Sequence, residues 1–81
     1  MTSEQIRAAR GLLNWTLRDL AEKAGVHHNT VGNIETGRYA GTPETLAAIR
    51  KAFERAGVEF INGDAPGVRI KKRSAKGRGR T

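Results

Sequence analysis

The sequence contains no cysteine, and it has only two prolines, one tryptophan, one tyrosine and two phenylalanines. Without cysteine, disulfides, thiolate nucleophiles and thiolate metal sites are all excluded. The chain also lacks any run of about 18 uncharged apolar residues, and no apolar stretch precedes a small-residue cleavage site, so we expect neither a membrane span nor a signal peptide. These absences predict a cytoplasmic protein whose core is held by apolar packing alone.

With 81 residues, of which 37% are hydrophobic, the chain supports one small domain and no deep enzyme pocket. No Ser-His-Asp arrangement, phosphate-binding loop or metalloprotease motif occurs, so catalysis has no support. Glu22 and Glu35 are interpreted as helix-surface charges. His27 and His28 are adjacent, and without a third histidine they do not predict a metal site. We expect no enzyme activity, no cofactor and no small-molecule ligand.

Acidic residues are missing from the C-terminal end. Residues 1–68 hold equal numbers of basic and acidic side chains, so the whole formal charge of +7 belongs to residues 69–81. Residues 73–81 are rich in glycine and basic residues, and their only apolar side chain is Ala75. We predict that residues 73–81 form a flexible basic tail that contacts a polyanion. The alternative is a solvated tail that only aids solubility.

Two segments begin with a capping signal. Thr2 is followed three residues later by Gln5, and Thr16 by Asp19, which is the spacing of a capping box. We expect the first helix to end around residues 13–14 and the second to end at Gly25, because glycine adopts the left-handed conformation without a penalty. The apolar faces of these two helices comprise Ile6, Ala9, Leu12 and Leu13, followed by Leu17, Leu20, Ala21 and Ala24.

A third and a fourth helix follow after short turns. Residues 28–36 place Val31 and Ile34 on an inner face, and Gly37 ends the segment. Thr42 caps the fourth predicted helix, with Pro43 at its first position, where the missing N–H costs no hydrogen bond. Gly57 ends this helix, whose apolar face comprises Leu46, Ile49, Ala52 and Phe53.

The hydrophobic period changes after residue 57. Residues 58–62 and 68–71 alternate as strands do, and the Gly- and Pro-containing residues 63–67 join them, so we predict a β-hairpin within residues 58–72. A two-stranded hairpin is marginal in water and must pack on the helices or on a second subunit. We expect it to contribute to a homodimer interface through Val58, Phe60, Val68 and Ile70.

Residues 17–36 have the pattern of two helices joined by a tight turn. Helices that cross at about 90–120° need a small residue at their contact and a residue tolerant of positive φ in the turn. Ala21 and Gly25 meet these two needs, and Val31 and Ile34 anchor the second helix. The outward residues of the second helix and the turn before it are His27, His28, Asn29, Gly32, Asn33 and Thr36.

On these residues the chain resembles the helix-turn-helix family of phage repressor and Cro proteins, also called the XRE family, over roughly residues 3–57. The matching segments are Trp15-Thr16, residues 20–26, Thr30-Val31, residues 34–38 and residues 42–46. The resemblance implies a mainly α, lambda-repressor-like helix-turn-helix bundle of four to five short helices within residues 1–57, here with a C-terminal β-hairpin. It also implies that residues 28–36 are the recognition helix that enters the DNA major groove.

By position in the family, the resemblance implies two groups of DNA contacts. The residues placed at base edges are His28, Asn29, Gly32, Asn33 and Thr36. The residues placed near phosphates are Arg10, Thr16, Arg18, His27, Thr30 and Arg38, to which the basic tail adds Arg73. An asparagine at the groove face can form two hydrogen bonds with adenine.

Two positions depart from the family pattern. Leu17 stands where many members have a polar residue, often glutamine, so a backbone N–H at the helix N-terminus is left to serve the phosphate. Gly32 lies inside the recognition helix, where it costs about 1 kcal/mol relative to alanine. It either permits close approach to a thymine methyl or the DNA backbone, or it loosens the free helix.

The sequence therefore favours a sequence-specific transcriptional regulator that binds a pseudo-palindromic, double-stranded DNA operator as a homodimer. Like the small controller-type members of the family, it is expected to act at its own promoter, as a repressor and in some cases also as an activator that touches RNA polymerase through Glu22 or the Glu35 region. Two alternatives stay open. One is an antitoxin-type protein-interaction module that also binds DNA, and the other is non-specific nucleic-acid binding by the tail.

Overall fold

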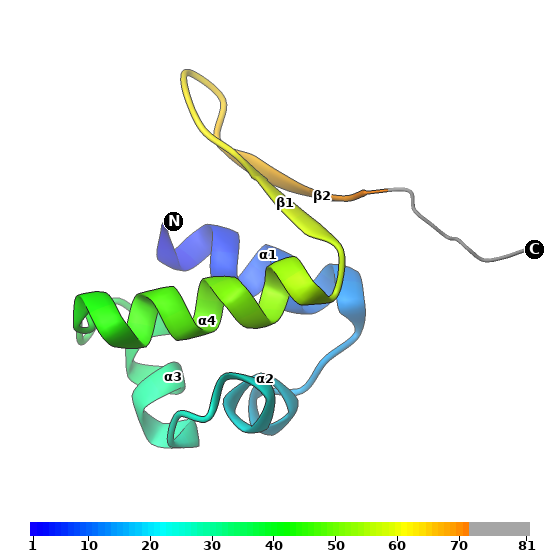
Figure 1. Ribbon diagram of the computed structural model, residues 1–81. Coiled ribbons are helices and arrows are strands. Elements are labelled where there is room, and N and C mark those ends of the chain that lie inside the picture. Colours follow the sequence, from blue (N-terminus) through cyan, green and yellow to red (C-terminus); the bar gives the residue numbers. More distant parts are fainter. Residues whose placement is uncertain (72–81) are drawn as a thin grey trace, which may run out of the picture.

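The computed structural model describes residues 1–71 and contains four helices followed by a two-stranded antiparallel sheet (Figure 1). The elements are α1 (Ser3–Leu13), α2 (Leu17–Ala24), α3 (His28–Glu35), α4 (Pro43–Arg55), β1 (Val58–Ile61) and β2 (Gly67–Ile70). This arrangement confirms the predicted mainly helical bundle with a C-terminal hairpin. Residues 73–81, including Arg73, lie outside the described residues.

The helices begin where the capping signals predict. In α1 the Gln5 N–H donates to the Thr2 hydroxyl at 3.1 Å, and the Thr2 N–H donates to the Gln5 side-chain oxygen at 2.8 Å. The reciprocal pair in α2 joins Thr16 and Asp19 at 2.9 and 3.0 Å. Gly25 ends α2 with φ +70°. The boundaries of these helices are therefore fixed by hydrogen bonds within four residues of sequence.

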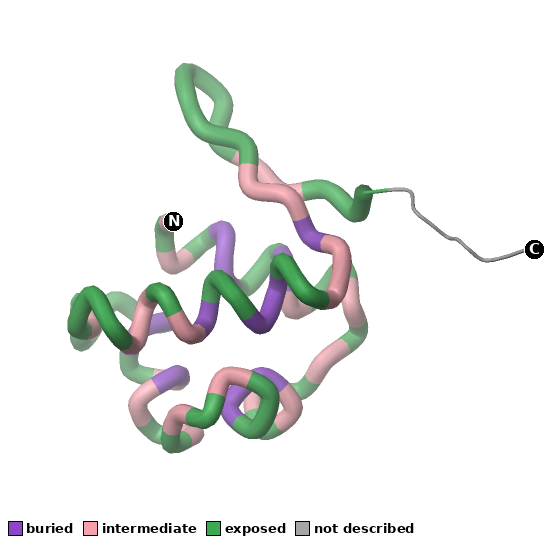
Figure 2. The backbone as a smooth tube through the Cα atoms, in the orientation of Figure 1, coloured by how far each residue is buried: buried purple, intermediate pink, exposed green. Residues whose placement is uncertain are grey.

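All four helices and β1 contribute side chains to one core (Figure 2). The largest fully buried side chains are Ile6, Leu20, Val31, Ile49, Phe53 and Val58. Leu12, which was expected on the inner face of α1, is instead 48% exposed. It follows Ala9 by three residues at the very end of the helix, where no neighbouring element covers it. None of the helices within residues 1–71 is long and apolar enough to cross a membrane.

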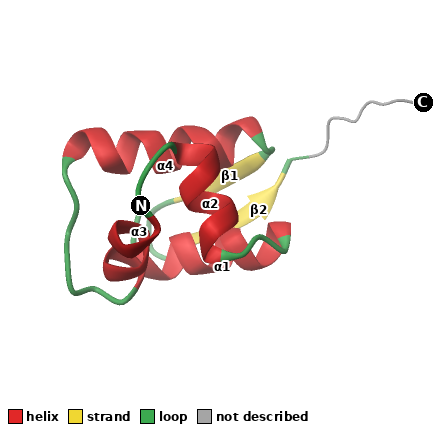
Figure 3. Ribbon diagram, turned by 90° about the horizontal axis from the view of Figure 1, so that it is seen from below, coloured by secondary structure: helices red, strands yellow, loops and turns green. Residues whose placement is uncertain are grey.

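Helices α1 and α4 lie along opposite edges of the molecule in Figure 3, with α2 crossing between them, and Figure 1 shows α2 and α3 on one side of this pair and the hairpin on the other. β1 contacts α4 and β2 contacts α1, while α2 packs on both α3 and α4. The hairpin and α3 are therefore at opposite sides of the molecule.

The hairpin pairs Val58 with Ile70 and Phe60 with Val68, and each strand ends one residue before its predicted end. Val58 is only 1% exposed and belongs to the core of its own chain, so this side chain is not available to the dimer interface expected of it. Phe60 of β1 packs edge-on against Phe53 of α4, with ring centroids 5.8 Å apart. Val58, the strand residue nearest α4, is therefore the most deeply buried residue of β1.

The buried Gln5 side chain attaches the hairpin to α1. Its amide nitrogen donates to the carbonyl oxygens of Ile61 and Gly67, each at 3.0 Å, while its oxygen serves the Thr2 cap. One amide thus satisfies both the N-terminus of α1 and two facing hairpin carbonyls. Since Gln5 is 3% exposed, its own amide would lack partners in a buried place without these hydrogen bonds.

Candidate nucleic-acid interface

The turn between α2 and α3 is tight and closely bonded. The Val26 N–H donates to the Ala21 carbonyl at 2.9 Å, and the left-handed Gly25 lets the chain reverse without a Cβ clash. Leu20 and Val31, both 0% exposed, hold the two helices together. Rigid packing on this inner side fixes the direction in which the other side of α3 points.

The outer side of α3 gathers the residues expected to read DNA. Asn29, Asn33 and Thr36 are exposed, and His28 and Gly32 are half-buried on the flank toward α2. The Thr36 hydroxyl lies 3.1 Å from the Gly32 carbonyl and 3.2 Å from the Asn33 carbonyl, to which it donates. The two asparagine amides are the exposed groups of this face that offer both a donor and an acceptor.

A histidine caps the N-terminus of α3. The His27 Nδ1 accepts a hydrogen bond from the Asn29 N–H at 3.1 Å, and its ring stacks on His28 with centroids 4.5 Å apart. Desolvation, followed by the charge of Arg18 and by His27, lowers the pKa of His28 below its ordinary value. This shift favours the neutral imidazole, in which one ring nitrogen donates and the other accepts.

Of the residues expected at phosphates within residues 1–71, all but Arg10 lie around the ends of α2 and α3. Thr16, Arg18, His27 and Arg38 are exposed around the ends of α2 and α3, and Thr30 is half-buried. A hollow of about 320 Å³, lined by residues from Arg18 to Glu22 and from Val26 to His28, lies between the start of α2 and the start of α3.

Arg10 is turned inward instead. Its Nε and Nη2 donate to the two carboxylate oxygens of Glu35 at 2.7 and 3.0 Å, and its Nη1 donates to the Trp15 carbonyl at 3.0 Å. The hydrogen bonds to Glu35 raise the pKa of Arg10. Arg7 adds a hydrogen bond to the Glu35 carbonyl. These contacts tie the C-terminal end of α3 to α1, so Arg10 supports α3 from inside.

The interpretation of Glu35 as a surface charge was wrong, because its residue is only 3% exposed. It is therefore not an acidic surface for RNA polymerase, whereas Glu22 is exposed on α2. A signal for burial was present, since Glu35 follows the buried Val31 by four residues and so shares its helix face. The partner, 25 residues away on α1, had no local signal.

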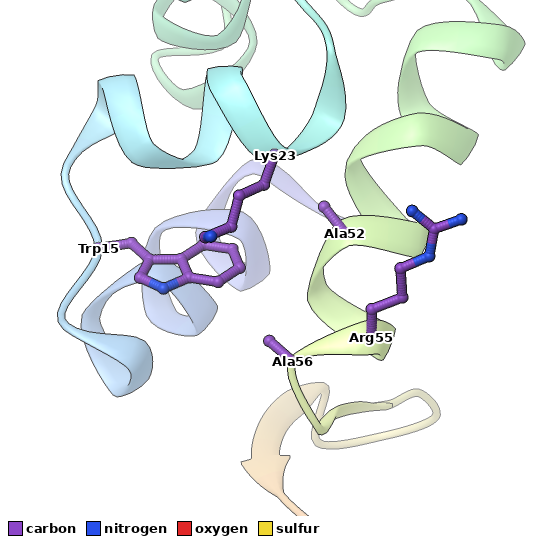
Figure 4. Close-up of a pocket in the computed structure, with 5 residues that line it drawn as sticks. All are labelled: Trp15, Lys23, Ala52, Arg55 and Ala56. Carbon is purple, nitrogen blue, oxygen red and sulfur yellow. The ribbon is translucent and has the colours of Figure 1, made fainter.

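Trp15 lines a shallow hollow on another side of the bundle, between the start of α2 and the end of α4 (Figure 4). Its ring stacks on Phe53 at 5.7 Å between centroids, and the Lys23 ammonium lies 5.4 Å from its centroid. Ala52 and Ala56 form the opposite wall, and Arg55 points away from the ring (Figure 4). Trp15 thus closes the edge of the core.

The remaining residues expected at a dimer interface lie on the hairpin. Phe60 and Val68 are half-buried against the bundle, and Ile70 is 44% exposed. Ile61, which sequence reasoning did not select, is 38% exposed. The alternation of β1 predicts that Ile61 faces away from Phe60.

Comparison with known families matches residues 6–60 to the model described as Helix-turn-helix. Comparison with curated proteins gave no match. The matched range covers α2, the turn and α3, together with the helices that support them. The chain therefore belongs to the Cro/C1-type helix-turn-helix family, the XRE family of DNA-binding regulators.

Proposed function

We propose that this protein is a sequence-specific regulator that reads double-stranded DNA through the outer side of α3. The proposal rests on one observation: the inner side of α3 is fixed in the core, while its outer side carries two exposed amides. Val31 and Ile34 are buried in the core, while Asn29 and Asn33 are exposed one helical turn apart. In the major groove, an amide at this position can accept and donate toward one adenine.

The spacing of the two amides suits neighbouring base pairs. Residues four apart on a helix lie on the same face, displaced by about 6 Å along the axis. Arg18 and Arg38 are exposed at the beginning of α2 and just after α3, so cationic groups flank the amides on both sides. Phosphate contacts at the flanks would set the register, and the amides would supply the sequence preference.

We further propose that the protein acts as a homodimer on a pseudo-palindromic operator. Ile61 and Ile70 are exposed apolar side chains on opposite faces of the hairpin, so a partner copy would meet both only along an edge of the hairpin. Because the hairpin and α3 lie on opposite sides of the bundle (Figures 1 and 3), a pair joined through the outer face of the hairpin would turn the two α3 helices apart. The proposed dimer therefore joins the hairpins edge to edge and not face to face.

The mass of the protein in solution tests the dimer. Light scattering should give twice the chain mass for the wild type and the single-chain mass for Ile70→Lys. Lys71→Ala, at the neighbouring exposed position, is the matched control and should stay dimeric. A monomeric wild type, measured both free and on selected DNA, would contradict the proposal.

Regulation would follow from the position of the operator. A dimer bound across a promoter excludes polymerase and represses, and at the promoter of its own gene it limits its own concentration. Activation would require contact with polymerase beside the operator, for which the exposed Glu22 on α2 is the remaining acidic candidate.

Selection from a random duplex library at near-physiological salt tests DNA reading directly. We expect the wild type to enrich an inverted repeat and the Asn29→Ala/Asn33→Ala variant to enrich none. The control is Asn62→Ala, an exposed amide at the hairpin end, which should enrich the same repeat as the wild type. Equal enrichment by all three proteins would refute reading by α3.

A second candidate is an antitoxin-type interaction module, which the exposed isoleucines of the hairpin favour. In that case the hairpin would bind a protein, and the helices would bind DNA for autoregulation. Absence of any enriched sequence, together with loss of a co-purifying partner in Ile61→Lys, would favour this function over the first.

A further inference from the structure

The fold does not require glycine at position 32. Gly32 is a helical residue of α3, and it is not among the glycines with positive φ. A Cβ built there would lie 3.7 and 3.9 Å from the two δ-methyl carbons of Leu17, which is ordinary van der Waals contact. Alanine is the better helix former. The glycine therefore weakens α3 although the chain itself has room for a side chain.

Gly32 lies at the edge of the face that carries the asparagines. It follows His28 by one helical turn, and on a helical projection it falls between the outward Asn29 and the flank nearest α2. Leu17 is the first residue of α2, is half-buried, and closes this flank. With no side chain at position 32, the δ-methyl carbons of Leu17 adjoin bare α3 backbone, and we call this apolar spot the Leu17–Gly32 recess. The rest of the surface presents amides, hydroxyls and imidazoles.

We propose that the Leu17–Gly32 recess receives the C5-methyl group of a thymine in the major groove. This inference rests on the proposed function, and it names the chemical group that α3 reads beside the amides. Among the four base pairs, the thymine methyl is the one apolar group at the major-groove edge. Cytosine has only a hydrogen at the same carbon and would leave the recess unfilled.

The two departures from the family pattern then have one explanation. Leu17 replaces a polar side chain by two methyl groups, and Gly32 removes the Cβ that would stand between those methyl groups and an incoming base. A larger residue at position 32 would occupy the space that the thymine methyl needs. Leu17 and Gly32 are thus specificity-determining residues that act through van der Waals contact and not through hydrogen bonds.

Single-atom changes in the DNA test this inference. On a duplex selected by the wild type, each thymine is replaced in turn by uracil, which removes only the methyl group. We expect one position in each half-site to lose affinity about fourfold, the fold-change that matches burial of one methyl-sized group. Cytosine at that position should bind more weakly than 5-methylcytosine, which restores the methyl.

The matched protein variant is Gly32→Ala. We expect it to fold with a melting temperature at or above that of the wild type, to bind the thymine duplex more weakly, and to give equal affinities for thymine and uracil at the sensitive position. Gly11→Ala is the control, because Gly11 is an exposed helical glycine of α1 with nothing within 4 Å of a built Cβ. This control should gain stability and keep the full response to uracil.

The outcomes separate the inference from the proposed function. A selected site at which no uracil changes the affinity overturns the recess and leaves sequence-specific binding intact. The recess is also overturned if Gly32→Ala retains the wild-type ratio of thymine to uracil affinity. Failure to select any site overturns the proposed function, and the recess with it.

Discussion

His27 gives α3 an N-cap unlike those of the other helices. Its Nδ1 accepts a hydrogen bond from the Asn29 N–H, whereas the hydroxyls of Thr2, Thr16 and Thr42 cap α1, α2 and α4. The His27 ring also stacks on the ring of His28, with centroids 4.5 Å apart. Two adjacent imidazoles therefore stand at the start of α3.

We predict that the melting temperature falls between pH 7.5 and pH 5.5. The lowered pKa of His28 means that the unfolded chain binds more protons than the folded chain once the pH falls below the unfolded value of about 6.5. Stability is therefore lost on acidification.

His28→Gln tests this prediction. Glutamine removes the imidazole whose pKa is lowered, so we expect a smaller fall in melting temperature than in the wild type. Thermal unfolding followed by circular dichroism at several pH values measures both slopes. The same slope in the wild type and in His28→Gln would show that His28 does not contribute.

At the scale of elements, α3 is held at its two ends in different ways. Its N-terminus depends on one imidazole, while its C-terminus is joined to α1 by the bidentate ion pair of Arg10 and Glu35. Arg10 is 25% and Glu35 4% exposed at the side chain, so the pair lies in a largely desolvated place. Removing one partner would leave an unpaired charge there.

We predict that Arg10→Met destabilises the fold by about 3–5 kcal/mol, the usual cost of breaking a buried pair by removing one member. The double variant Arg10→Met/Glu35→Met should recover most of this loss, because it leaves no uncompensated charge. Urea unfolding measures both.

Arg50→Met is the control for this prediction, because Arg50 pairs with Glu54 at 3.0 Å on the exposed side of α4. Exposed pairs are worth about 0–1 kcal/mol, so this change should have little effect. Equal losses in Arg10→Met and Arg50→Met would contradict the structural role of the buried pair.

Gln5 joins the hairpin to α1, as the Arg10–Glu35 pair joins α3 to α1. We predict that Gln5→Glu, whose carboxylate still accepts from Thr2 but cannot donate to the Ile61 and Gly67 carbonyls, loosens the hairpin from α1. Each hydrogen bond lost here costs about 0.5–1.5 kcal/mol. Hydrogen exchange should accelerate at the β1 and β2 amides and remain unchanged in α3. Uniform acceleration across all elements would instead indicate general destabilisation.

The ends of the helices were predictable from the sequence because they depend on residues close together in the chain. The caps at Thr2, Thr16 and Thr42 and the turn at Gly25 involve partners within five residues, and the structure confirms all four. Contacts between distant segments had no such signal. The Arg10–Glu35 pair was therefore missed, and the exposure of Leu12 and burial of Val58 depend on how elements cover one another.

The candidate site was only partly predictable for the same reason. Helical periodicity alone places Asn29, Asn33 and Thr36 on the side of α3 opposite Val31 and Ile34, and all three are exposed. Periodicity says nothing about which α2 residue lies beside α3. The contact between Leu17 and position 32 emerged only from the packing of the two helices.

On the scale of the whole molecule, the net charge and the amide-bearing side of α3 belong to different segments. Residues 1–68 are formally neutral, and the outer side of α3 carries uncharged amides, so the body offers little general attraction for DNA. The basic residues of the tail are Arg73, Lys76, Arg78 and Arg80. We propose that this tail supplies phosphate contacts that act on every sequence alike, while α3 supplies discrimination.

We predict that replacing the four basic tail residues by glutamine weakens binding to all duplexes and leaves the selected consensus unchanged. Each phosphate that a protein neutralises adds about 0.9 to the slope of log affinity against log salt, so the slope should fall by up to about 3.6. The same chain length is kept, so only charge changes. Fluorescence anisotropy across a salt series measures the slope on selected and scrambled duplexes. A changed consensus would show that the tail reads bases, and an unchanged slope would leave the tail as a solubility element.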